Sequence, residues 1–203
     1  MSATKGFASI CIQALVDRGA IDVNEKVSTY WPEYGCNGKE ATIIRHLLLH
    51  TAGVVGFDGM HEVVRHDGTG WGDLDSIAPR LAECKPSYEP GTKHTYHALT
   101  IGWLLAEIVR RVDGRTIGRF FAEEIAGPLG LEAWMGAPPD MLSHTAQVYD
   151  IQLDHLPKPL RNAQHRYWQQ RVIHTNSSDA RSSATESAAD SIMSKRSSTM
   201  GKC

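Results

Sequence analysis

The sequence predicts a mainly α-helical protein. Apolar residues recur at spacings of three and four along most of residues 1–150, which is the period of one helix face, whereas the strict alternation of a half-buried strand is almost absent. Glycines stand where these periodic stretches stop, as at Gly19 and Gly114, and glycine readily closes a helix. The 203 residues are enough for one domain with its own core.

The first helix is expected over residues 2–18. Gly19 follows it as a C-terminal cap. A linker that contains Trp31-Pro32 then leads to Thr42. The apolar face of the helix is formed by Phe7, Ile10, Cys11, Ala14 and Leu15.

A short second helix is expected from Ile43 to His50. Thr42 can cap its start, and Gly53 ends it. Six glycines fall between residues 53 and 72, so this stretch is expected to be a loop.

Three more helices are expected in the second half of residues 1–150. The first is capped by Asp73 or Asp75 and runs to about Cys84, after which Glu89-Pro90-Gly91 makes a turn. The second carries Leu99, Gly102, Trp103, Ala106 and Val109 on one face and stops at Gly114. The third runs from Ile117 to Ile125, with Thr116 as its cap and Gly127-Pro128 beyond its end.

Composition divides the chain near Asp150. Residues 1–150 form the predicted domain. Residues 151–175 carry two prolines and scattered apolar residues, a pattern that is ambiguous and compatible with one peripheral helix. Residues 176–203 contain nine serines and no aromatic residue, so they are expected to be a disordered tail, because so few apolar groups cannot offset the entropy of ordering.

Charge and hydropathy exclude several classes of partner. A net charge of -2 gives no electrostatic reason to bind nucleic acid. No apolar run approaches the roughly 20 residues of a membrane span, and the N-terminus lacks the order of a signal peptide. We therefore expect a cytoplasmic protein with no nucleic-acid or membrane partner, and the oligomeric state stays open. The four cysteines form no C-x-x-C pair.

The first candidate for chemistry is Ser2-Ala3-Thr4-Lys5. Residues three apart lie on neighbouring turns of one helix face, so the Lys5 amine can reach the Ser2 hydroxyl. This pairs a nucleophile with a base, and a serine at a helix N-terminus also lies near backbone N–H groups that can hold an oxyanion. Four residues alone are a weak signal, and the alternative is an N-cap serine beside an exposed lysine.

Further stretches of the chain add to that signal. Four motifs follow one another along the chain: SATKGFASICIQALVDRG at 2–19, IIRHLLLHTAG at 43–53, Pro90-Gly91 with YHALTIGW at 96–103, and IAGPLGL at 125–131. This order resembles the serine beta-lactamase and penicillin-binding-protein superfamily, within it the class C-like branch of beta-lactamase-related carboxylesterases. The resemblance covers about residues 2–136.

The resemblance implies a role for each motif residue. Ser2 would be the acylated nucleophile, Lys5 the base that activates it, and Tyr96 the tyrosine that carries a proton to or from the leaving group. The family usually writes this second motif Y-x-N, and here Ala98 stands in place of the asparagine. His97 is a candidate for binding substrate, with a polar surface loop as the alternative. The implied substrate is a small ester or amide, and no metal or organic cofactor is implied.

The resemblance also implies a fold. The superfamily has an α+β fold, and its third motif, K-T-G or a variant on a strand, is not found after residue 136, while no strand-forming segment precedes Ser2. We therefore expect a chain truncated at both ends that holds mainly the helical subdomain, with the antiparallel sheet largely missing. The function expected is that of a serine hydrolase, and the alternative is a catalytically inactive fragment or helical interaction module.

His46 and His50 are four residues apart, which is a spacing found in zinc sites. An H-E-x-x-H site needs a glutamate at position 47, where Leu47 stands. We interpret both as structural histidines and expect no metal site.

Overall fold

The structure is a computed structural model that describes residues 2–65 and 68–144. Within these residues it contains helices and helical turns but no strand; the one β-type contact is an isolated antiparallel bridge between Lys26 and Ile43. The expected mainly helical fold is confirmed. The elements are α1 Thr4–Asp17, α2 Val27–Tyr30, the 3-10 turn Pro32–Tyr34, α3 Ile44–Leu48, α4 Met60–Val63, α5 Leu74–Glu83, α6 Thr100–Asp113, α7 Ile117–Phe121, the π turn Ala122–Ala126 and the 3-10 turn Pro139–His144.

Two of the predicted segments, 151–175 and 176–203, lie outside the described residues. The division of the chain near Asp150 therefore stays a prediction. In the described part of the chain, no helix has the length and apolar character that crossing a membrane requires.

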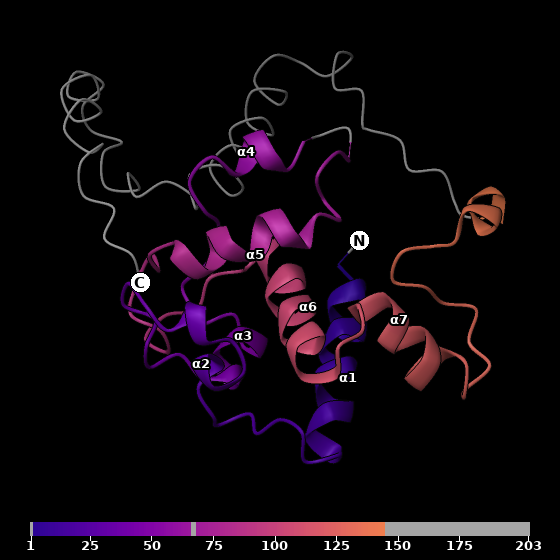
Figure 1. The fold of residues 1–203 in the computed structure, drawn as a ribbon, viewed down its shortest axis with the longest axis horizontal. Coiled ribbons are helices and arrows are strands. Elements are labelled where there is room, and N and C mark those ends of the chain that lie inside the picture. The colour runs from indigo at the N-terminus through magenta and orange to yellow at the C-terminus, as the bar shows by residue number, and fades with distance from the viewer. Residues whose placement is uncertain (1, 66–67, 145–203) are drawn as a thin grey trace, which may run out of the picture.

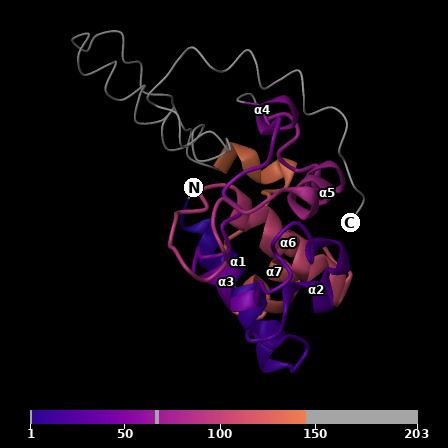
Figure 2. The ribbon, with the colours of Figure 1, turned by 90° about the vertical axis from the view of Figure 1, so that its left-hand side faces the viewer.

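Helix α6 is the centre of the fold. Helices α1, α2, α3, α5 and α7 all contact it, as Figure 1 and the turned view of Figure 2 show. Phe7 of α1 stacks on Phe121 of α7, with ring centroids 4.9 Å apart, so α1 is held by two helices. The residues of α1 and α6 that close this core are Ala8, Cys11, Ile12 and Leu15 together with Ile101, Leu104, Leu105, Ile108 and Val109.

The prediction of which residues form the buried face of α1 is partly wrong. Ile10 is 46% exposed, and Ile12 is fully buried in its place. Both residues are apolar, so the helical period alone could not choose between them. The packing of α6 on one side and α7 on the other makes that choice.

Helix ends follow the predicted capping residues with two exceptions, both at α3. Gly53 does not end this helix, because it stops at Leu48 with Leu49 as its C-cap. Asp73 accepts a hydrogen bond from the Ser76 amide at 3.1 Å, and Thr116 accepts one from the Arg119 amide at 3.3 Å. The Thr42 cap is wrong, because Thr42 is buried and α3 begins after Ile43. The ring of His46 reaches back instead and accepts from the Ile43 amide at 3.4 Å.

Three short elements were not expected. Helix α2 and the turn Pro32–Tyr34 lie in the predicted linker, and α4 lies in the glycine-rich loop. Each has only three or four residues, which is too short for a helical period to appear in the sequence. Isolated turns of this length are stabilised by tertiary contacts, not by intrinsic propensity.

A buried carboxylate ties α6 to its neighbours. The side chain of Glu107 is 0% exposed. It accepts hydrogen bonds from Arg110 Nε at 2.8 Å and Arg111 Nε at 2.6 Å. Arg110 also pairs with Asp75 of α5, and Arg111 pairs with Glu33 of the turn Pro32–Tyr34. A buried charge needs such partners, since an unpaired one is strongly destabilising.

We expect Glu107→Ala to lower the free energy of unfolding by about 3 kcal/mol. This is the lower end of the range for a broken buried pair, because both arginines keep access to water. Urea unfolding followed by circular dichroism measures it. The matched control is Glu123→Ala, which removes a 43% exposed glutamate that also pairs with arginines and should cost less than about 1 kcal/mol. Equal losses in the two variants would contradict the prediction.

Candidate active site

Ser2 and Tyr96 meet although 94 positions separate them. Ser2 Oγ and Tyr96 Oη lie 2.8 Å apart, and either hydroxyl can donate the hydrogen bond. Ser2 stands two residues before α1, and Tyr96 stands four residues before α6. The packing of α1 against α6 therefore brings the two segments together.

Lys5 completes the group. It lies in the first turn of α1, and its backbone N–H donates to the Ser2 carbonyl at 3.2 Å, so the two residues are one turn apart as the sequence predicts. Its Nζ lies 5.0 Å from the centroid of the Tyr96 ring. The structure thus brings all three expected catalytic residues to one place.

The surroundings of Tyr96 favour its ionised form. The hydrogen bond with Ser2 and the neighbouring Lys5 ammonium together hold the pKa of the Tyr96 phenol below its ordinary value of 10.0. The side chain is 48% exposed, so water screens part of this effect. The arrangement combines a hydroxyl nucleophile, a cation and a phenol that loses its proton more readily than a free tyrosine.

The segment that carries Tyr96 is held against the stretch 45–53. The Thr95 amide donates to the His50 carbonyl at 3.1 Å, and the Gly91 amide donates to the Thr51 carbonyl at 2.8 Å. Gly91 has a φ of +87°, and a Cβ there would lie 2.9 Å from Nε2 of His46. This close approach explains why a glycine follows Pro90.

His50 has a contact that the sequence did not indicate. Its ring centroid lies 5.1 Å from that of Tyr96, and its Nδ1 accepts a hydrogen bond from the His97 amide at 3.0 Å. The sequence pattern predicts a structural role for both His46 and His50. The structure separates them, because His46 serves the start of α3 and His50 faces Tyr96. Among the described residues, no three His, Cys, Asp or Glu side chains are grouped as a metal site would need.

His97 does not lie where a substrate-binding residue would. Its side chain is 0% exposed, and its Nδ1 lies 2.6 Å from the Thr95 carbonyl oxygen, to which it donates. Burial lowers the pKa of His97 to about 4, so the ring is neutral near pH 7. The substrate-binding role of His97 stays a prediction, and the geometry gives it no support.

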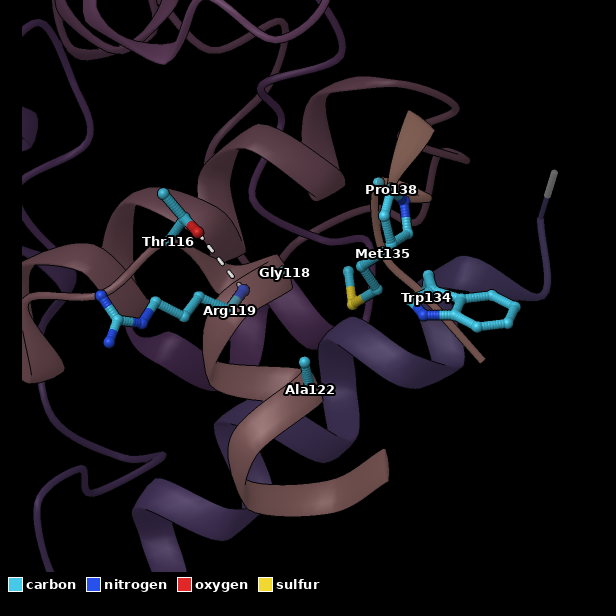
Figure 3. Close-up of a pocket in the computed structure, with 8 residues that line it drawn as sticks. Thr116, Gly118, Arg119, Ala122, Trp134, Met135 and Pro138 are labelled. Atoms are coloured by element: carbon cyan, nitrogen blue, oxygen red, sulfur yellow. Dashed lines mark hydrogen bonds between the residues drawn. The ribbon is translucent and has the colours of Figure 1, made fainter. Parts of the chain in front are cut away.

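A separate hollow lies away from these residues. It has a volume of about 320 Å³, and Figure 3 shows it between the start of α7 and the segment that carries Trp134 and Pro138. Its lining includes Thr116, Arg119, Ala122, Trp134, Met135 and Pro138, and none of Ser2, Lys5 and Tyr96.

Comparisons with known proteins show which proteins this chain resembles. The Beta-lactamase family matches residues 1–192 of the chain. The esterase/beta-lactamase LipL of Mycobacterium tuberculosis is 39% identical over 151 residues, which cover 72% of this chain and 33% of LipL. The crystal structure of a penicillin-binding protein homolog from Caulobacter crescentus has a TM-score of 0.64 and 37% identity, over 72% of this chain and 38% of that one.

A family VIII carboxylesterase of known crystal structure is also similar. Its TM-score is 0.66 at 32% identity, over 85% of this chain and 48% of the carboxylesterase. The chain thus spans a third to a half of the length of these proteins. The helices described above match part of the fold that the solved structures share, and the family match covers most of the sequence. The chain belongs to the Beta-lactamase family.

Proposed function

We propose that the protein is a serine hydrolase that cleaves a small ester or amide through an acyl intermediate on Ser2. The observation that carries the proposal is the 2.8 Å contact between Ser2 Oγ and Tyr96 Oη, with Lys5 beside the tyrosine ring. A serine becomes a good nucleophile only when a neighbouring group removes its proton. Tyr96 is in hydrogen-bond contact with that hydroxyl, and Lys5 lies beside Tyr96.

In the first half of the reaction, Ser2 Oγ attacks the carbonyl carbon of the substrate. The hydroxyl proton passes to Tyr96 in its phenolate form, which the Lys5 ammonium stabilises, and the carbonyl oxygen becomes an oxyanion. The 14-residue helix α1 begins two residues after Ser2, and the positive end of its dipole favours negative charge there. The bond to the leaving group then breaks, and the leaving oxygen or nitrogen takes the proton.

In the second half, water attacks the acyl carbon and gives a proton to the same acid-base group. The bond between the acyl carbon and Ser2 Oγ breaks, and Ser2 recovers its proton. A tyrosine with a lowered pKa suits both halves, because it can lose and regain a proton within the accessible range of pH.

Within that substrate class we favour an ester. Ala98 stands where the related motif has an asparagine, and alanine has no side-chain group to hydrogen-bond a substrate amide. The similarity to the esterase/beta-lactamase LipL and to a family VIII carboxylesterase supports ester cleavage. The alternative of an inactive interaction module has no observation of its own among the described residues.

We expect Ser2→Ala to abolish covalent labelling by a fluorophosphonate probe. The probe transfers its phosphonyl group to an activated serine oxygen with loss of fluoride, and the variant lacks that oxygen. Hydrolysis of a p-nitrophenyl ester should fall by about 1,000-fold or more. Mass spectrometry of the labelled full chain locates the adduct.

Ser9→Ala is the matched control for this test. Ser9 lies on the same helix, and its hydroxyl donates to the Lys5 carbonyl at 2.9 Å, so the variant removes a serine hydroxyl seven positions from Ser2. Labelling should continue at the wild-type rate. An intact wild-type chain that takes no label at Ser2 would contradict the proposal.

We expect Tyr96→Phe to lower the labelling rate by about 100-fold or more at pH 8, because it removes the acid-base hydroxyl. In the wild type, the phenolate becomes populated as the pH rises through the Tyr96 pKa. The rate should therefore rise with pH and reach half its maximum below pH 10, the ordinary tyrosine value. A pH profile of labelling measures both effects, and an unchanged profile in Tyr96→Phe would assign the base elsewhere.

A further inference from the structure

His50 occupies a position where glycine is usual. Helix α3 ends at Leu48, and beyond Leu49 the His50 amide donates to the Leu47 carbonyl while the Thr51 amide donates to the His46 carbonyl. These two bonds form a Schellman motif, whose residue after the C-cap takes a left-handed conformation. His50 has a φ of +58°, a left-handed backbone conformation that is unfavourable for L-residues with a Cβ atom.

The contacts of His50 bracket Tyr96 on both sides. Its carbonyl oxygen accepts from the amide of Thr95 at 3.1 Å, and its Nδ1 accepts from the amide of His97 at 3.0 Å. Its ring lies against the Tyr96 ring, tilted by 41° with 5.1 Å between centroids. One residue thus holds the backbone before Tyr96, the backbone after it and the ring itself.

Tyr96 depends on such support because little else fixes it. It lies outside any helix or strand, and its side chain is 48% exposed. A misplacement of about 1 Å of a reacting group can cost about 100-fold in rate. The distance between Tyr96 Oη and Ser2 Oγ is therefore set mainly by the 95–97 segment.

We propose that His50 is a positioning residue that fixes Tyr96 for reaction at Ser2 through its Nδ1 acceptor and its ring. The inference rests on the proposed function of Ser2 and Tyr96. It explains why a histidine stands at a left-handed position that suits glycine better.

The Nδ1 contact makes the arrangement sensitive to protonation. An Nδ1 that accepts from the His97 amide carries no proton, so the neutral ring holds its proton on Nε2. Protonation of His50 places an N–H against the His97 N–H and breaks the contact. Burial, His94 and Lys5 lower the His50 pKa below its ordinary value of 6.5. The titratable groups around the ring are Lys5 from α1 and Tyr88, His94, Tyr96 and His97 from the segment before α6.

The kinetic test compares His50→Gly with His50→Asn. Glycine suits the left-handed backbone but removes the acceptor and the ring, so the chain should fold while fluorophosphonate labelling of Ser2 slows about 10- to 100-fold. Asparagine tolerates the same backbone and places an amide oxygen near the position of Nδ1, so it should recover most of the rate. His46→Asn, a histidine of α3 four residues before His50, is the matched control and should label like the wild type.

A double variant shows whether His50 acts through Tyr96. In a Tyr96→Phe background, His50→Gly should slow labelling by less than about 3-fold, because the group that it positions is already absent. A full additional loss would assign His50 a role independent of Tyr96. Wild-type labelling should also fall below pH 6.5 more steeply than that of His50→Asn, since only the histidine gains a proton there.

An NMR measurement separates this inference from the proposed function. The imidazole ¹⁵N spectrum of the full chain should show His50 protonated on Nε2, and the His97 amide should shift as His50 titrates below pH 6.5. If the wild type takes no label, the proposed function fails and the NMR result still decides the contact. If the wild type is labelled and folded His50→Gly is labelled equally fast, the positioning role is overturned.

Discussion

The packing of α1 on α6 is the contact on which the candidate site depends. Ser2 precedes α1 by two residues, and Tyr96 precedes α6 by four residues, so the two hydroxyls meet only because the two helices lie together. The buried faces of both helices are almost wholly apolar, which favours their association without selecting one relative placement. One more specific contact restricts the position of α1: Phe7 stacks on Phe121 of α7, which itself packs on α6. Arg110 and Arg111, which bind the buried Glu107 of the same helix, pair with Asp75 and Glu33 and hold α6 against α5 and the turn Pro32–Tyr34.

The end of α3 provides the second constraint. Most helices that close with a Schellman motif place glycine at its left-handed residue, and replacing it with a residue that carries a Cβ costs on the order of 1 kcal/mol. Here the cost falls on His50, whose two acceptors hold the segment around Tyr96. Backbone strain of this kind persists only where the surroundings impose it. The Thr51 and Gly91 contact beside it supplies part of that support.

The sequence predicted the parts of the fold that span several helical turns. Helices α1, α5 and α6 show a clear period and clear ends, and Ser2, Lys5 and Tyr96 followed from the order of their motifs. The burial of Glu107 and His97 could not be predicted, because the pattern of a helix or loop does not indicate which polar side chain the neighbouring elements will cover. Arg110 and Arg111 have the pattern of a solvated helix end, yet both pair with the buried Glu107. His50 was missed because its conformation depends on hydrogen bonds between segments about 45 residues apart.

The solvent exposure of the candidate site weakens the attraction between Tyr96 and Lys5, and a bound substrate that excludes water would strengthen it. A pair of unit charges 4 Å apart gains about 1 kcal/mol in bulk water and about 4 kcal/mol at an effective dielectric constant of 20. Tyr96 is about half exposed, so without substrate its attraction to Lys5 is close to the first case. An acyl group that covers the tyrosine excludes water and moves the pair toward the second. In the proposed mechanism, Lys5 then raises the fraction of Tyr96 that is phenolate when the ester is bound, and this is the form that accepts the Ser2 proton.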